Sequence, residues 1–232
     1  MTDLSQAKDQ IYSVTNFKDL VSTPFKGEMN AIFWSRQLTG DFLEIINKVK
    51  LSGNITVISP EELLELQLSK QGQMARELIL NDLIVLKAHC AAPTLNVIQH
   101  YERDDSFLFF PTDVYSFHVD RSLIPTDTFL CTYYGESSEI IPNSQAIQKV
   151  LVPEIRQELK KLYNGPEEGF ESFLTENFFD LHYLAKPDAR PISIGLGNLC
   201  RLAVDHPESK VLPCLHRAPK EKIGEPRLLL IC

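Results

Sequence analysis

The chain has 232 residues, of which 44% are hydrophobic and 23% are charged. This size and composition fit one medium domain, or one domain with a helical extension, and exclude a low-complexity or collagen-like chain. The net charge of −8 at pH 7 disfavours broad binding to nucleic acid or to anionic membranes, because proteins bind both mainly through Lys and Arg.

The sequence also predicts a compartment. The longest charge-free stretch, residues 88–101, is too short and too polar to span a bilayer, and the N-terminal residues are polar and acidic where a signal peptide needs a basic start and an apolar run. No CxxC pair is present, which disfavours a disulfide framework and a four-cysteine zinc site. We expect a cytoplasmic protein with five free, buried cysteines: Cys90, Cys131, Cys200, Cys214 and Cys232.

The first third of the chain has a largely helical pattern. An apolar run at residues 30–34 is a candidate strand, and residues 38–49 carry apolar side chains at helical spacing. Residues 59–62 (Ser-Pro-Glu-Glu) are typical of a helix start, because Ser and Glu can form a capping box around a Pro in the first turn. We expect helical structure from there to about residue 87, with a break or kink at Gly72.

After residue 93 the pattern changes to short strand-like runs bounded by Pro, Gly and Asp. Strands are expected at residues 95–101, 115–119, 128–134, 192–196, 199–204, 211–215 and 227–231, with helices at 151–164 and 170–184. This order predicts an α+β protein with an antiparallel barrel or sandwich. It divides the chain into a mainly helical region (residues 1–93) packed on a β-core (residues 94–232), which has a helical insertion at about 151–185.

The candidate site is a group of histidines. His118 and Asp120 lie two residues apart in a strand-like run, so their side chains are expected on the same face. His216, in a later strand-like run, would complete two imidazoles and one carboxylate, an arrangement that leaves positions open on Fe(II). Arg227 follows, and its guanidinium could hold a carboxylate through two parallel hydrogen bonds.

Two other His-x-acid pairs weaken the motif as a signal. His100 and Glu102 lie at the end of an expected strand and compete with His118 and Asp120. The other pair, at residues 206–208, has a Pro between its members and is expected in a loop. Each of these histidines could also be an ordinary core or surface residue.

The order of strand, His-x-Asp, strands, helical insertion, distal His and Arg resembles the Fe(II)/2-oxoglutarate-dependent dioxygenase superfamily. Several segments also resemble a bacterial domain family of unknown function: residues 30–36 (NAIFWSR), 117–120 (FHVD), 130–135 (LCTYYG), 215–219 (LHRAP) and 227–230 (RLLL). The superfamily resemblance implies a double-stranded β-helix, which is a jelly-roll or cupin-like fold, with an N-terminal helical region and a helical insertion.

The resemblance implies roles for particular residues. His118, Asp120 and His216 would bind Fe(II), and Arg227 would hold the distal carboxylate of 2-oxoglutarate. A hydroxyl partner for that carboxylate stays open among four side chains: Tyr101, Tyr115, Thr132 and Tyr134.

The implied activity is hydroxylation or a related C–H oxidation of a small molecule or a peptide side chain. An aspartate ligand favours this reaction, since halogenating relatives replace it with a small residue. Two alternatives stay open: a non-catalytic jelly-roll protein that senses or stores metal, and a zinc-dependent hydrolase that uses the same ligands. The N-terminal helices have three open roles, which are to brace the barrel, to form a homodimer contact or to cover the substrate entrance.

Overall fold

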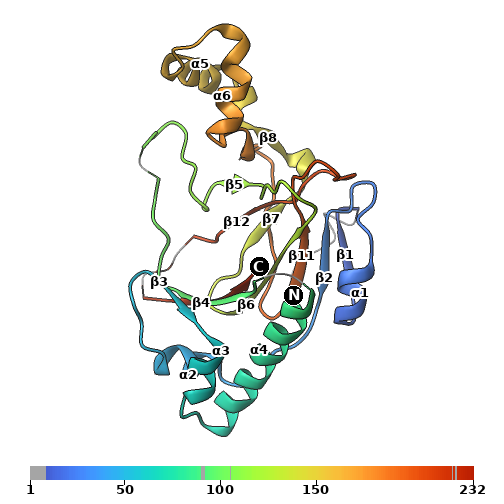
Figure 1. Ribbon diagram of the computed structural model, residues 1–232, viewed down its shortest axis with the longest axis vertical. Coiled ribbons are helices and arrows are strands. Elements are labelled where there is room, and N and C mark those ends of the chain that lie inside the picture. The colour runs from blue at the N-terminus through green and yellow to red at the C-terminus, as the bar shows by residue number, and fades with distance from the viewer. Residues whose placement is uncertain (1–8, 90–91, 105, 221, 223) are drawn as a thin grey trace.

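The structure, a computed structural model, describes residues 9–89, 92–104, 106–220, 222 and 224–232. Two sheets built mainly from antiparallel pairs form the centre of the molecule, with α2, α3 and α4 at one end and α5 and α6 at the other (Figure 1). This arrangement confirms the expectation of a mixed fold with antiparallel sheets.

The larger sheet has seven strands in the order β1-β2-β11-β6-β13-β4-β3. These strands are β1 (Ile11–Val14), β2 (Ala31–Trp34), β3 (Ile55–Ile58), β4 (Thr94–Ile98), β6 (Asp127–Tyr134), β11 (Leu199–Ala203) and β13 (Arg227–Ile231). The smaller sheet has six strands in the order β10-β7-β12-β5-β9-β8. They are β5 (Phe117–His118), β7 (Glu139–Ile141), β8 (Ala146–Gln148), β9 (His182–Ala185), β10 (Ile192–Ser193) and β12 (Leu215–Arg217).

The helices lie between these strands along the chain. They are α1 (Phe17–Ser22), α2 (Phe42–Lys48), α3 (Pro60–Glu65), α4 (Lys70–His89), α5 (Pro153–Leu162) and α6 (Phe170–Glu176). Short 3₁₀ turns flank α5 and α6 and include Lys149–Leu151 and Phe179–Leu181.

The N-terminal third of the chain contributes strands as well as helices. Its strands β1, β2 and β3 belong to the seven-stranded sheet, and β1 pairs with β2 in parallel, joined through α1. The expected strand at residues 30–34 is therefore present, whereas β1 and β3 were not predicted. Residues before 94 thus form part of the central sheet in addition to covering it.

Two helix starts follow the local sequence. Ser59 caps α3, with its side chain accepting from the Glu62 N–H while the Glu62 carboxylate accepts from the Ser59 N–H, so the expected capping box is confirmed. The expected break in this helical region is present, but at residues 66–69 between α3 and α4 rather than at Gly72. Ser69 starts α4 because its Oγ accepts from the Gly72 N–H at 3.2 Å, so Gly72 lies in the first turn of the helix.

The structure corrects two further element predictions. The expected helix at residues 170–184 ends at Glu176, and β9 begins at His182. Between them Phe178 has φ 60° and ψ 15°, a left-handed conformation that costs an L-residue about 1–2 kcal/mol and turns the chain away from the helix axis. The expected strand at 211–215 begins only at Leu215, and Tyr115 lies in a turn before the two-residue strand β5.

Apolar clusters explain why the layers associate. One cluster contains side chains from both sheets, including Leu130 and Leu229 of the larger sheet and Ile140 and Ile192 of the smaller one. Burial of this kind contributes roughly 1.5–3 kcal/mol for each large aliphatic side chain. Other clusters join the larger sheet to α2, α3 and α4, cover the opposite face of the smaller sheet, and hold α5 against α6.

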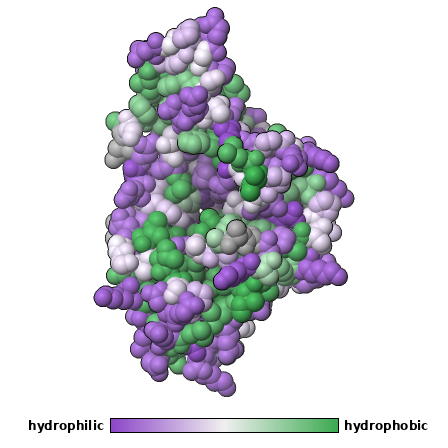
Figure 2. Space-filling model, in the orientation of Figure 1, coloured by the Kyte–Doolittle hydropathy of each residue, from purple (hydrophilic) through white to green (hydrophobic). Residues whose placement is uncertain are grey.

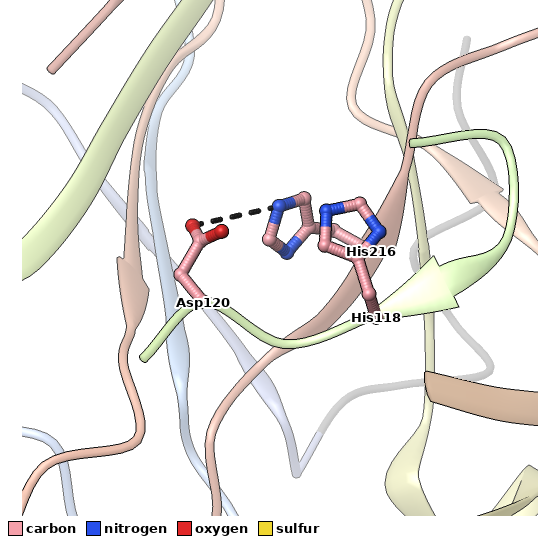
Figure 3. Close-up of side chains that lie close together, drawn as sticks. All are labelled: His118, Asp120 and His216. Carbon is pink, nitrogen blue, oxygen red and sulfur yellow. Dashed lines mark ion pairs between the residues drawn. The ribbon is translucent and has the colours of Figure 1, made fainter. Parts of the chain in front are cut away.

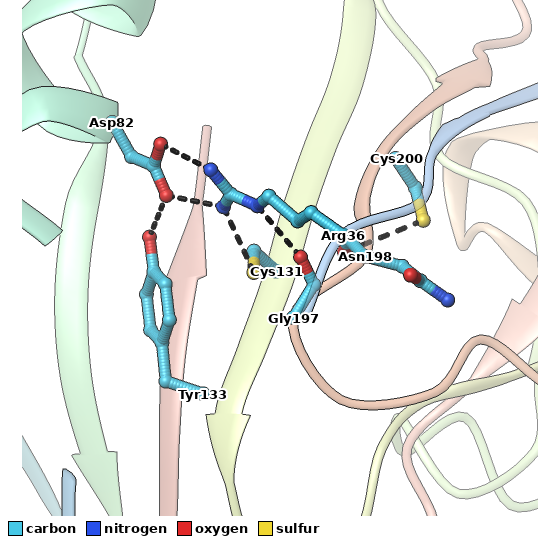
Figure 4. Close-up of polar contacts among 7 residues, drawn as sticks. All are labelled: Arg36, Asp82, Cys131, Tyr133, Gly197, Asn198 and Cys200. Carbon is cyan, nitrogen blue, oxygen red and sulfur yellow. Dashed lines mark hydrogen bonds and ion pairs between the residues drawn. The ribbon is translucent and has the colours of Figure 1, made fainter. Parts of the chain in front are cut away.

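A buried ion pair links α4 to the larger sheet. The Arg36 guanidinium donates to both carboxylate oxygens of Asp82 and to the carbonyl of Gly197 (Figure 4). The hydroxyl of Tyr133 donates to the same carboxylate at 2.6 Å. Asp82 is fully buried, and both oxygens of its carboxylate accept hydrogen bonds, as buried polar atoms usually do.

Three of the five cysteines are free and buried in the structure, and one is not. Cys131, Cys200 and Cys214 are free and buried, as expected. Cys232 is disulfide-bonded, so the expectation of a free thiol is wrong there, and Cys90 lies outside the described residues. Among the residues that the structure describes, no helix combines the length and the apolar character that crossing a bilayer requires.

Candidate metal centre

Three histidines form one row across neighbouring strands of the smaller sheet. His216 of β12 lies opposite His118 of β5, and His118 lies opposite His182 of β9. Directly opposed residues of an antiparallel pair point to the same face, so the three imidazoles share a face. The ring centroids of His118 and His216 are 4.5 Å apart, and those of His118 and His182 are 6.0 Å apart.

Asp120 lies beside two of these imidazoles, just after β5 (Figure 3). One ligand atom from each of His118, Asp120 and His216 lies within 4.8 Å of the others, close enough to bind one metal ion. The distance from Asp120 Oδ2 to His216 Nε2 is 3.6 Å. Within the described ranges no other His, Cys, Asp and Glu side chains form such a group of three.

Backbone carbonyls orient both imidazoles of the triad. The Nδ1 of His118 lies 2.8 Å from the carbonyl oxygen of Ser116, and the Nδ1 of His216 lies 3.2 Å from that of Cys214. A carbonyl accepts only, so these contacts place the proton on Nδ1 and leave the Nε2 lone pair for a metal. Hydrogen bonds of this kind fix the orientation of metal-binding histidines in proteins.

The electrostatics keep His118 and Asp120 in the protonation states that a metal needs. Burial, with a contribution from His216, lowers the pKa of His118 to about 4, so this imidazole is neutral at neutral pH. Burial alone would raise the pKa of Asp120, but His216 and the hydroxyl of Thr128 lower it below its usual value. Thr128 belongs to β6, so the hydrogen bond that holds Asp120 comes from the other sheet.

His182 is a site residue that the sequence did not reveal. Its side chain is 6% exposed, and its Nδ1 has no hydrogen-bond partner in the described part of the chain. Burial, with contributions from Lys149 and His118, lowers its pKa to about 3. No motif surrounds His182 in the sequence. Its segment was predicted to be helical, whereas it forms strand β9, which pairs with β5.

A buried lysine holds the residue that orients His118. Lys149 Nζ donates to the hydroxyl of Ser116 at 2.7 Å and to the carbonyl of Pro111 at 2.8 Å. Ser116 is also the residue whose carbonyl orients His118. Burial lowers the pKa of Lys149 to about 8. The ammonium group therefore stabilises the turn that presents the first ligand.

Arg227, the expected carboxylate clamp, begins β13 in the larger sheet and is 4% exposed. Its Nε donates to the Glu136 carbonyl at 2.7 Å and its Nη2 to Ser138 Oγ at 3.0 Å. Its Nη1 lies 3.5 Å from the hydroxyl of Tyr101. The cavity beside Arg227 has a volume of about 10 Å³, which is room for one water molecule.

The four hydroxyl candidates have different surroundings. Thr132 lies opposite Leu229 of β13, is fully buried, and has an Oγ1 without a hydrogen-bond partner among the described residues. Tyr115 accepts from the backbone N–H of Tyr101 at 3.0 Å. Tyr134 packs against the cluster on the helix side of the larger sheet. Thr132 is therefore the candidate with a buried hydroxyl that has no partner among the described residues.

The remaining candidates lie away from the triad. Arg217 follows His216 directly but donates to Glu139 at 2.7 Å and lies over the ring of Phe117, on the opposite face of the sheet. The competing His100 is exposed beside another pocket, and His206 is half-buried beside a third. Neither belongs to a group of three ligands within the described ranges.

No family model, no curated protein and no solved structure matches this chain significantly. The chemistry of the site therefore rests on its own residues and geometry.

Proposed function

We propose that this protein is a non-haem Fe(II)- and 2-oxoglutarate-dependent oxygenase on a double-stranded β-helix fold. The observation that carries the proposal is the convergence of two imidazoles and one carboxylate, from β12, β5 and the residue just after β5, on a single point. Two histidines and one carboxylate are the ligand set that leaves three positions of Fe(II) open.

The residues fit a divalent metal ion. His118 and His216 offer Nε2 lone pairs whose orientation is held by backbone carbonyls, and Asp120 offers a charged carboxylate. Nitrogen and oxygen donors of this kind suit Fe(II), and they also suit zinc, as the hydrolase alternative requires. The ligand set therefore supports the binding of a divalent metal ion, and it does not distinguish iron from zinc.

The fit to 2-oxoglutarate rests on two side chains of the larger sheet. Arg227 is a buried guanidinium, and Thr132 has a buried hydroxyl without a hydrogen-bond partner among the described residues. These groups are suited to a carboxylate. The cavity at Arg227 is only about 10 Å³, so binding there requires the side chains that line it to move apart and make room for the ligand.

Each residue has a defined part in the proposed reaction. Bound iron and 2-oxoglutarate supply oxygen activation and the oxidation of a substrate C–H bond. Asp120 and the two histidines hold the metal on one side, while Thr128 and the backbone carbonyls fix the ligands. Arg227 and Thr132 orient the co-substrate. The protein thus contributes ligand geometry and positioning.

The test is an anaerobic titration of the metal-free protein with Fe(II), followed by 2-oxoglutarate. We expect one Fe(II) per chain, a weak visible charge-transfer band after 2-oxoglutarate is added, and slow succinate formation in air. Arg227→Ala should weaken 2-oxoglutarate binding about tenfold or more without changing the affinity for Fe(II). Arg217→Ala is the matched control, because Arg217 lies next to a ligand in sequence but on the opposite face.

A second candidate is a metal-binding protein without redox chemistry. It is favoured by the bonds that Arg227 makes to Glu136 and Ser138, which occupy part of the guanidinium. This candidate predicts tight metal binding that 2-oxoglutarate does not change, and an equal response from the Arg227 and Arg217 variants.

A further inference from the structure

A pocket of about 230 Å³ opens beside the candidate metal centre. Its lining includes two of the ligands, His118 and Asp120, and the ring of His182. The remaining lining residues are Thr112, Asp113, Val114, Val119, Arg121, Phe178 and Leu181. The pocket therefore lies against two of the three candidate metal ligands.

The polar side chains of the outer lining are already bonded to the protein. Arg121 donates to the carboxylates of Asp180 and Asp205. The carboxylate of Asp113 accepts from two backbone N–H groups, at 3.1 and 3.3 Å, and the hydroxyl of Thr112 donates to Asp104. Beside these bonded groups, the pocket presents apolar surface from Val114, Val119, Phe178 and Leu181.

Phe178 is the most unusual residue of the lining. It is 59% exposed, and it is the one non-glycine residue with a positive φ in the described ranges. Gly or Asn normally occupies such a position after a helix, since a bulky side chain there is strained. Burial in the protein core does not compensate for this strain, because the ring lies largely in solvent.

Two segments of the lining, at Arg121 and at Phe178, are tied to each other beside the pocket. Arg121 joins the loop after Asp120 to the loop after Phe178 through its bonds to Asp180. The first loop exposes Leu123 (90%) and Ile124 (69%) to solvent. Figure 2 shows a hollow in the molecule below the α5–α6 end, with hydrophobic side chains along its edge.

We propose that this pocket receives an apolar, ring-sized group of the substrate and that Phe178 is the residue that positions it beside the metal. The size supports this class, because a cavity of about 150 Å³ holds benzene whereas a whole drug-sized molecule needs about 300 Å³ or more. The strained backbone holds the Phe178 ring at the mouth, where an exposed aromatic ring can pack on an incoming ring. The inference rests on the proposed function, since it names the substrate class of the same site.

The test uses indole as the probe, followed by ligand-observed NMR with metal-free and Co(II)-loaded protein. We expect indole to bind both forms and its ring protons to broaden strongly only in the Co(II) form, because paramagnetic Co(II) affects nearby nuclei. Phe178→Gly should weaken indole binding about tenfold. The same change should raise the melting temperature by about 2–4 °C, because glycine relieves the backbone strain.

Controls and contrary outcomes separate this inference from the proposed function. Ile84→Ala removes another exposed apolar side chain, on α4, and should leave indole binding unchanged. Indole that does not bind, or that binds equally well to Phe178→Gly, overturns the inference while leaving the metal site intact. Indole binding that depends on Phe178 in a protein that takes up no Co(II) overturns the proposed function and supports the pocket.

Discussion

Two polar clusters of this protein differ in how their hydrogen bonds are satisfied. Around Asp82, the carboxylate accepts from Arg36 and Tyr133, and Arg36 also donates to the Gly197 carbonyl, so donors and acceptors are matched (Figure 4). Although burial lowers the pKa of Arg36, the bonds to Asp82 raise it above its usual value. The cluster is closed and joins α4 to the sheet.

The histidine row of the smaller sheet is open instead. Backbone carbonyls accept from one nitrogen of His118 and one of His216. The carboxylate of Asp120 lies beside both rings, and its contact with His216 Nε2, the ion pair drawn in Figure 3, is 3.6 Å long and so beyond hydrogen-bond distance. His182 adds a buried Nδ1 without a partner among the described residues. Unsatisfied buried polar atoms cost free energy, so an open cluster is the one that indicates a ligand.

The largest expected effect comes from breaking the closed cluster. Asp82→Ala leaves the Arg36 charge buried without its partner and should lower the free energy of unfolding by about 3–5 kcal/mol. Urea denaturation measures it. The double variant Arg36→Met with Asp82→Leu removes both charges and should recover most of the loss. An equally unstable double variant would show that packing, rather than the unpaired charge, causes the loss.

Removing a candidate ligand from the open cluster should change metal affinity strongly and stability little. His216→Ala should lower the affinity for Co(II) more than about 100-fold, because even residues that only support metal ligands account for 10–100-fold. The free energy of unfolding of the metal-free protein should change far less than in Asp82→Ala. Isothermal titration calorimetry and urea denaturation measure the two quantities. Unchanged Co(II) affinity would remove His216 from the site.

The contact between the two sheets at Asp120 should have a smaller effect. Thr128→Val keeps the side-chain shape but removes the hydroxyl that donates to Asp120, so Co(II) affinity should fall about tenfold. Thr126→Val is the control, because Thr126 is exposed in the loop before β6. If both variants bind Co(II) equally well, Thr128 has no part in orienting Asp120.

A further expected effect is a change in the pH dependence of stability. The pKa values of His118 and His182 are lowered to about 4 and about 3, so below pH 6.5 the unfolded chain binds protons that the folded chain does not. Stability of the metal-free protein should therefore fall as the pH falls from 6.5 towards 4. His182→Phe should reduce this slope by about 1.4 kcal/mol per pH unit.

Urea denaturation at several pH values measures the slope. Leu184→Ala, on the same strand but exposed, is the control and should leave it unchanged. A His182→Phe slope equal to that of the unaltered protein would contradict the burial of a neutral imidazole.

Local patterns in the sequence predicted the parts of the structure that depend on a few neighbouring residues. The capping box at Ser59 is one case, because its donors and acceptors lie three residues apart. The shared face of His118 and Asp120 is another, because alternation along an extended chain acts over two residues. The strand that begins at Arg227 was predicted with its full range, whereas the strand predicted at residues 211–215 stops before His216 and shares only Leu215 with β12.

The predictions failed where sheet neighbours or tertiary contacts decided the outcome. The apolar spacing around His182 fits a helix as well as a strand, and pairing with β5 and β8 selected the strand. Likewise β1 and β3 are too short to give a clear pattern, and they are stabilised as strands by β2 and β4. Nothing near Arg36 in the sequence indicates Asp82, since the two residues are 46 positions apart.

By itself the sequence supplied the candidate metal ligands and placed His118 and Asp120 on the same face of the extended chain, because side-chain identity and local alternation need no knowledge of the fold. The tertiary structure alone decided that β12 lies beside β5, that β9 adds a third imidazole, and that Thr128 reaches Asp120 from the other sheet. These contacts join residues far apart in the chain. They depend on how the two sheets bury their common apolar cluster, which no local pattern encodes.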